Sequence, residues 1–64
     1  MPIDEKSLEI GKIYLEQTNS PNYPFTAYAK LGTNHYVTEI GATPEEAINN
    51  LRKNHPETLY FQPV

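Results

Sequence analysis

The sequence contains no cysteine and no long apolar run. Without cysteine, neither a disulfide framework nor a thiolate metal site can reinforce the core. No apolar run approaches the roughly 20 residues that a membrane-spanning helix needs. Residues 1–11 also lack the basic start and the apolar stretch of a secretory signal. We therefore expect a cytoplasmic protein with no membrane-spanning segment and no bound cofactor.

Basic residues are fewer than acidic ones, 5 against 8, which gives a net charge of −3. Binding to nucleic acid draws most of its affinity from lysine and arginine on phosphates, so this balance disfavours it. With 64 residues the chain forms one domain, residues 1–64. A domain of this size buries only about 60% of the surface of its unfolded chain. Self-association would add stability, so we expect a homo-oligomer.

Residues 1–9 are polar and predict a loose tail. Two alternatives remain open for this part of the chain. Residues 3–10 form a short helix that Gly11 ends, or Leu8 and Ile10 begin a strand that continues past a bulge at Gly11.

Alternation of apolar and polar residues predicts two strands, 12–17 and 25–31. They are separated by a loop, 18–24, that is rich in proline, asparagine and serine. The residues expected to face the core are Ile13, Leu15, Phe25, Ala27, Ala29 and Leu31.

A third strand is predicted over residues 35–40, which are β-branched and aromatic. Gly32-Thr33-Asn34 forms the hairpin connection before it, with Gly32 and Asn34 supplying positive φ angles. Its inward face is either that of Val37 or that of Tyr36 and Ile40.

The clearest local signal is a helix start at Thr43. The Thr43 side chain can accept a hydrogen bond from the first turn, Pro44 suits the first helical position, and Glu46 completes a capping box. Ala47, Ile48 and Leu51 form one apolar stripe. The sequence therefore predicts one amphipathic helix over the sheet.

The helix is expected to end at Asn54 in a left-handed cap, since Pro56 cannot continue it. Residues 57–62 alternate again and predict a final strand, with Leu59 and Phe61 on one face and Tyr60 and Gln62 on the other. The expected fold is a single small α+β domain, an antiparallel sheet with one helix packed on one face, in the order β-β-β-α-β.

Residues that could carry catalysis are few and scattered. Ser7 and Ser20 lack the Gly-x-Ser-x-Gly context of a nucleophile. His35 and His55 have no second ligand at a metal-binding spacing. Glu45 and Glu46 are explained by helix capping. We therefore expect a non-enzyme with no catalytic residues and no metal site.

The face of the sheet opposite the helix is the predicted binding surface. Three tyrosines and two lysines project onto it from the predicted strands: Tyr14, Tyr28, Tyr60, Lys12 and Lys30. Tyrosine is amphipathic and common at protein interfaces, although cross-strand aromatic pairs also stabilise sheets. A protein partner bound at this face or at an edge strand is the leading hypothesis.

Two other functions fit the same residues. Single-stranded nucleic acid could stack its bases on Tyr14, Tyr28 and Tyr60, although two lysines give little electrostatic support. A structural homodimer without a ligand is the third hypothesis.

The segment Tyr36-Val37-Thr38-Glu39 followed by Gly41-Ala42-Thr43-Pro44-Glu45-Glu46-Ala47-Ile48 resembles the HicB-like antitoxin family, a partial RNase H-like small domain. The similarity spans about residues 12–62. It implies a small domain that binds a toxin protein or another partner and that often dimerises.

Overall fold

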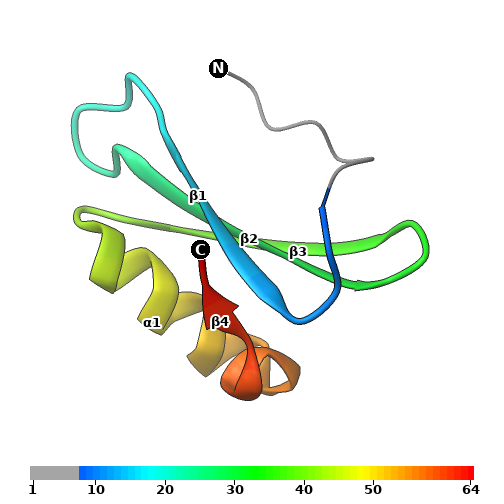
Figure 1. The fold of residues 1–64 in the computed structure, drawn as a ribbon. Coiled ribbons are helices and arrows are strands. Elements are labelled where there is room, and N and C mark those ends of the chain that lie inside the picture. The colour runs from blue at the N-terminus through cyan, green and yellow to red at the C-terminus, as the bar shows by residue number, and fades with distance from the viewer. Residues whose placement is uncertain (1–7) are drawn as a thin grey trace.

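The computed structural model describes residues 8–64, so most of the predicted tail lies outside the described residues. Three strands are followed by a helix, a short 3-10 helix and a fourth strand (Figure 1). Their bounds are β1 Lys12–Gln17, β2 Phe25–Gly32, β3 His35–Gly41, α1 Pro44–Asn54, η2 Pro56–Tyr60 and β4 Gln62–Pro63. No helix within residues 8–64 is long and apolar enough to cross a membrane.

The four strands form one sheet in the order β3-β2-β1-β4. The pairs β1–β2 and β2–β3 are antiparallel, whereas β4 lies parallel to β1. Helix α1 packs against β3 and β2. The α+β class, the single helix over one face and the β-β-β-α-β order are confirmed. The parallel β4 makes the sheet mixed.

The core lies between the sheet and α1. Its fully buried members are Ile13, Ala27, Ala29, Ala47 and Leu51. Leu15, Phe25, Val37, Ile48 and Phe61 pack around them and remain partly exposed. The inward face of β3 is therefore that of Val37, while Tyr36 and Ile40 point to the opposite side, because successive residues of a strand alternate between its faces.

Small residues at the contact let the helix approach the sheet closely. At Gly41, the last residue of β3, a Cβ atom would lie 2.8 Å from the Cα of Ala47 and 2.9 Å from the carbonyl carbon of Glu46. Such distances are too short for any side chain, so only glycine fits between β3 and the first turn of α1.

The hairpin between β2 and β3 uses one of the two predicted positive φ angles. Asn34 has φ 57°, whereas Gly32 is part of β2 and has no positive φ. Gly11, immediately before β1, has φ +94°. Glycine is favoured there because other residues rarely adopt that conformation.

Helix α1 begins as predicted. The Oγ1 of Thr43 accepts a hydrogen bond from the N–H of Glu46 at 3.1 Å, and Pro44 occupies the first helical position. The carboxylate of Glu46 accepts from the N–H of Ala42 at 3.2 Å, one residue before the usual position of this bond in a capping box. The N–H groups of Ala42 and Glu46 are thus both hydrogen-bonded to side chains at the start of α1.

We predict that Thr43→Ala lowers the free energy of unfolding by about 1 kcal/mol, because the N–H of Glu46 loses its acceptor. Urea denaturation followed by circular dichroism measures the change. Thr33→Ala is the matched control, since Thr33 is exposed in the β2–β3 turn. Equal loss in both variants would contradict the role of Thr43 as a cap.

The predicted left-handed cap at Asn54 is wrong. Asn54 is the last helical residue, and His55, with φ −133° and ψ 81°, closes the helix through its N–H to the carbonyl of Leu51 at 2.8 Å. No left-handed residue is needed, because the chain turns directly into η2.

The predicted final strand over residues 57–62 is wrong for its first five residues, because 57–60 lie in η2 and Phe61 belongs to no strand. Pro56 starts the 3-10 helix η2, since its fixed φ is already helical. The N–H and the Oγ1 of Thr58 both donate to the carbonyl of His55, at 2.9 and 2.8 Å. Thr58 is buried and Phe61 is partly buried, a spacing of three that replaces the expected alternation. Only Gln62–Pro63 remain as strand β4.

Candidate functional site

The face of the sheet opposite α1 carries four of the five predicted binding residues. Tyr14 and Tyr28 are direct partners in the β1–β2 register. Lys12 and Lys30 occupy even-numbered positions of the same strands and therefore lie on the same face. We call this surface, defined by these four residues, the far face.

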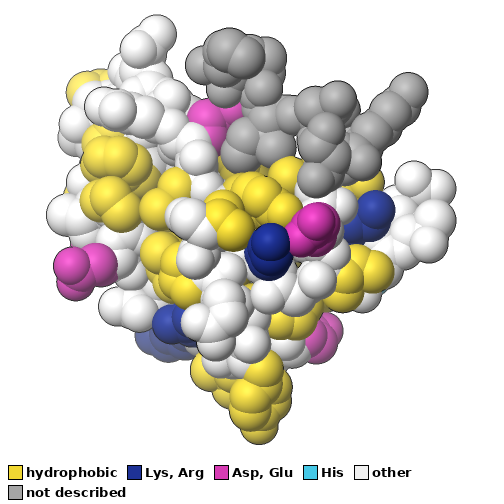
Figure 2. All heavy atoms as spheres, viewed as in Figure 1, with side chains coloured by type: hydrophobic (Ala, Val, Ile, Leu, Met, Phe, Trp, Pro, Cys, Tyr) yellow, Lys and Arg dark blue, Asp and Glu magenta, His cyan; other side chains and the backbone are white. Residues whose placement is uncertain are grey.

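Tyr60 does not belong to the far face. It lies in η2 and is 88% exposed, and Leu59 beside it is 55% exposed. The expectation that it projects from a final strand fails because that strand is replaced by η2. Figure 2 shows hydrophobic side chains at the position of η2.

The hydroxyl groups of the far face are bonded within the chain. Tyr28 donates to the carboxylate of Glu16 at 2.7 Å, and the hydroxyl oxygen of Tyr14 accepts from the N–H of Glu9 at 2.9 Å. Both tyrosines are only partly exposed. Their polar ends are therefore already satisfied, which weakens the case for this face as the site of a partner.

The two lysines of the far face are also engaged. Lys12 forms an ion pair with Glu9 at 2.7 Å. This hydrogen bond lowers the pKa of Glu9 and raises the pKa of Lys12. The ammonium group of Lys30 lies 5.9 Å from the centre of the Tyr36 ring, a cation–π distance.

Residues 8–10, just before β1, contact the far face through Glu9. Leu8 is only 7% exposed although it is not part of the core between sheet and helix. Glu9 bonds Tyr14, and Ile10 forms an isolated bridge with Lys30. Leu8 is buried, whereas Glu9 and Ile10 are exposed, and none of the three is helical. The burial of Leu8 does not fit a loose tail, and residues 1–7 of the predicted tail lie outside the described residues.

We predict that Tyr28→Phe lowers the free energy of unfolding by about 1 kcal/mol, because the carboxylate of Glu16 loses a partly buried donor. Urea denaturation measures the difference. Tyr23→Phe is the matched control, since Tyr23 is exposed in the loop between β1 and β2. A Tyr28 variant as stable as the control would show that this bond contributes nothing.

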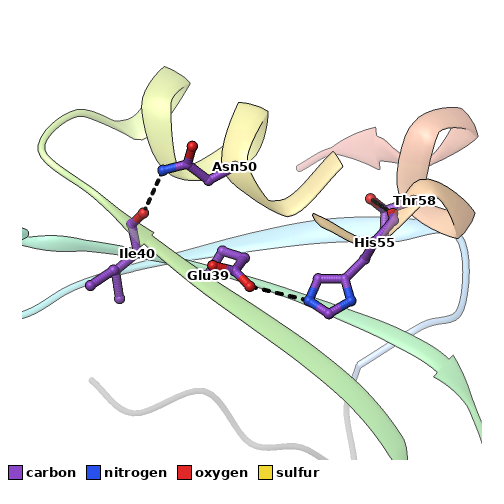
Figure 3. Close-up of polar contacts among 5 residues, drawn as sticks. All are labelled: Glu39, Ile40, Asn50, His55 and Thr58. Atoms are coloured by element: carbon purple, nitrogen blue, oxygen red, sulfur yellow. Dashed lines mark hydrogen bonds and ion pairs between the residues drawn. The ribbon is translucent and has the colours of Figure 1, made fainter. Parts of the chain in front are cut away.

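The edge of the sheet at β3 is held by α1. The side-chain amide of Asn50 donates to the carbonyl of Ile40 at 2.9 Å, which occupies a group that a further strand would need (Figure 3). His55 lies 3.2 Å from the carboxylate of Glu39 and joins β3 to the end of the helix. Blocking edge groups in this way is a usual protection against unwanted strand pairing.

The opposite edge is covered only in part. Strand β4 pairs with Lys12 and Ile13 of β1 and ends there. The N–H groups of Gln62 and Val64 donate to the carbonyls of Gly11 and Ile13. The backbone N–H and C=O groups of the odd-numbered residues of β1 therefore point away from β2. Leu15 and Gln17 follow the same alternation. Among residues 8–64, no strand pairs with them on that side.

Partly exposed apolar side chains lie next to this open edge. Leu15, Phe25 and Ile48 pack around the core without being fully covered. Figure 2 shows hydrophobic side chains at the surface between the positions of α1 and β1 in Figure 1. We call the backbone edge of Leu15–Gln17, together with the side chains of Leu15, Phe25 and Ile48, the β1 edge site.

The sequence predicted an edge strand as one of two candidate binding surfaces, but it did not indicate which edge. The strand and its inward residues were predictable from alternation, but how much of the edge β4 would cover was not. Pro56 and Pro63 are consistent with a short β4, since proline favours helix starts and strand ends, but they do not fix which residues of β1 it covers.

Acidic side chains and histidines do not gather into a metal site in the part of the chain that the structure describes. There, no group of three or more histidine, aspartate or glutamate side chains is placed to hold an ion. Comparison of the chain with protein-family models, with curated proteins and with solved structures gives no match. The fold and the site thus define an α+β domain with a half-open sheet edge.

Proposed function

We propose that this chain is a small, non-catalytic protein-binding module that adds an extended segment of a partner protein to the β1 edge site. The observation that carries the proposal is the short β4, after which no strand within residues 8–64 pairs with the outward backbone groups of Leu15 and Gln17. An extended segment at such an edge gains affinity from main-chain hydrogen bonds and specificity from alternate side chains.

The neighbouring apolar side chains support the same surface. A strand laid beside Leu15 would cover Leu15, Phe25 and Ile48, which the helix leaves partly exposed. Burial of apolar surface is the dominant favourable contribution in most protein–protein association. The far face is a weaker candidate, because the hydroxyl of Tyr28 is bonded to Glu16 and that of Tyr14 to the N–H of Glu9.

The resemblance to HicB-like antitoxins favours a toxin protein as the partner. An antitoxin that contributes its edge strand to a partner needs no catalytic residues, in keeping with the composition of the chain. Such a pair would meet in the cytoplasm. A homodimer through the same edge is the alternative that the experiment below separates.

The test compares proline variants at the two sheet edges. Gln17→Pro removes an N–H that points away from β2, so β1–β2 pairing is retained while addition at β1 is blocked. Thr38→Pro removes an outward N–H on β3 and is the matched control. Wild-type and variant proteins are immobilised and exposed to an extract of the source cells, and bound proteins are quantified by mass spectrometry.

We expect one partner to be captured by wild type and by Thr38→Pro, and to be reduced at least about tenfold by Gln17→Pro. Circular dichroism checks that both variants are folded. Light scattering on the isolated chain shows whether a dimer forms and whether Gln17→Pro abolishes it. If Gln17→Pro still captured the partner protein and Lys30→Gln did not, the β1 edge site would be contradicted. The far face would then be the binding surface.

A further inference from the structure

Charged residues surround the β1 edge site on both sides of the sheet. Glu16 lies between Leu15 and Gln17 and points to the far face. Its direct neighbour on β2 is Thr26, which is uncharged. The ion pairs within residues 8–64 are Lys12–Glu9 and His55–Glu39, so Glu16 takes part in none of them. Its carboxylate accepts one hydrogen bond, from Tyr28.

A second carboxylate lies on the helix side. Glu45, Ile48 and Arg52 are spaced by three and four residues and therefore share one face of α1. Arg52 donates to the carbonyl of Phe61 at 3.0 Å, just before β4, so this face is turned toward the β4 side of the sheet. Ile48 and then Glu45 continue along it past the end of β4, and Glu45 is exposed.

From this arrangement we infer that the segment bound at the β1 edge site is an extended peptide in which apolar and basic side chains alternate. The inference rests on the proposed function and specifies the partner. A residue opposite Leu15 directs its side chain to the helix side, against Leu15, Phe25 and Ile48, and is apolar. The next residue lies opposite Glu16, directs its side chain to the far face, and is basic.

Cross-strand pairs of opposite charge stabilise a sheet, whereas like charges directly opposite each other destabilise it. A basic residue of the bound segment, placed opposite Glu16, would thus form the ion pair that Glu16 lacks within residues 8–64. Glu45 also favours a basic residue in the bound segment. Such a residue on the helix side, beyond the side chains of Leu15, Phe25 and Ile48, would approach the Glu45 carboxylate. The net charge of −3 acts in the same direction during encounter.

A second copy of the chain fits this requirement less well. Pairing of two β1 edges would bring Leu15–Gln17 of one copy next to the same three residues of the other. The carboxylate of each Glu16 would then lie close to that of the other copy. The charge at the site therefore favours a different, basic partner over self-association.

The test uses three blocked seven-residue peptides and the ¹⁵N-labelled full chain. In the first peptide valine alternates with lysine, in the second valine alternates with glutamate, and the third is the lysine peptide with N-methylated backbone. We expect the lysine peptide to shift the amide signals of Leu15, Glu16 and Gln17 and to bind roughly tenfold tighter than the glutamate peptide. N-methylation removes the donors and should abolish the shifts.

Neutral variants identify the carboxylates. Glu16→Gln keeps an acceptor for Tyr28 but removes the charge, and Glu45→Gln removes the charge on the helix side. Each should weaken the lysine peptide by roughly two- to fivefold, and the effect should diminish at high salt. Glu57→Gln, exposed in η2, is the matched control and should leave binding unchanged.

The outcomes separate this inference from the proposed function. Equal binding of the lysine and glutamate peptides at Leu15–Gln17 would overturn the basic partner and leave the edge site standing. Equal binding of the N-methylated peptide, or no shift at these amides with any peptide, would overturn strand addition at β1. Amide shifts at Leu15–Gln17 that depend on the concentration of the chain alone would make a second copy the occupant and overturn the inference.

Discussion

Replacing Gly41 with alanine is expected to lower the free energy of unfolding by about 3 kcal/mol or more. The added Cβ would overlap the backbone nitrogen and the Cα of Ala47, and a backbone cannot move aside as a flexible side chain can. A domain of this size has a total stability of roughly 3 to 10 kcal/mol. Gly41→Ala would therefore remove a large part of that stability.

Circular dichroism and urea denaturation measure this loss. Gly32→Ala is the matched control, because the nearest atom to an added Cβ there is the Cβ of His35 at 4.0 Å. We expect the control to change stability by less than about 0.5 kcal/mol. Similar midpoints for the two variants would mean that α1 does not approach β3 at Gly41 as closely as described.

Leu51→Ala is expected to destabilise the protein by about 2 to 5 kcal/mol, because it removes a side chain that is fully buried between sheet and helix and leaves a cavity. Leu51 is among the largest of the fully buried side chains, so neighbouring side chains are not expected to fill the cavity completely. The measurement is the shift of the urea midpoint at constant slope.

The matched control for Leu51 is Leu59→Ala, since Leu59 is 55% exposed in η2. We expect the control to cost less than about 1 kcal/mol. A Leu51 variant no less stable than the Leu59 variant would place the core elsewhere. A Leu59 variant that loses partner binding without losing stability would add η2 to the binding surface.

Local chemistry made the first three strands and the start of α1 predictable from the sequence. Alternation identifies β1 and β2, and the cap at Thr43 needs only the residues beside it. The inward face of β3 required the structure, because Tyr36 and Val37 are both apolar enough to be buried. In the structure Val37 packs against the core, so its face of β3 is the inward one.

The C-terminal part was not predictable in the same way. Residues 57–62 alternate as a strand would, but the helical start at Pro56 and the buried Thr58 produce η2 instead. Two further features depend on contacts between distant residues, the packing of Leu8 outside the core and the small extent of β4. Of the two predicted binding surfaces, the far face and an edge strand, we therefore favour the edge at β1.

The pairing of β4 with β1 also has a kinetic consequence. It joins Lys12 to Gln62, which are far apart in the sequence, and such non-local contacts form late in folding. Only two residues of ladder hold β4 to β1, so β4 should also open first in the native protein. Each opening would lengthen the available edge of β1 from Leu15 back to Ile13. The domain would then alternate between a closed and a more receptive state without unfolding, and hydrogen exchange at Val64 faster than at Tyr28 would reveal it.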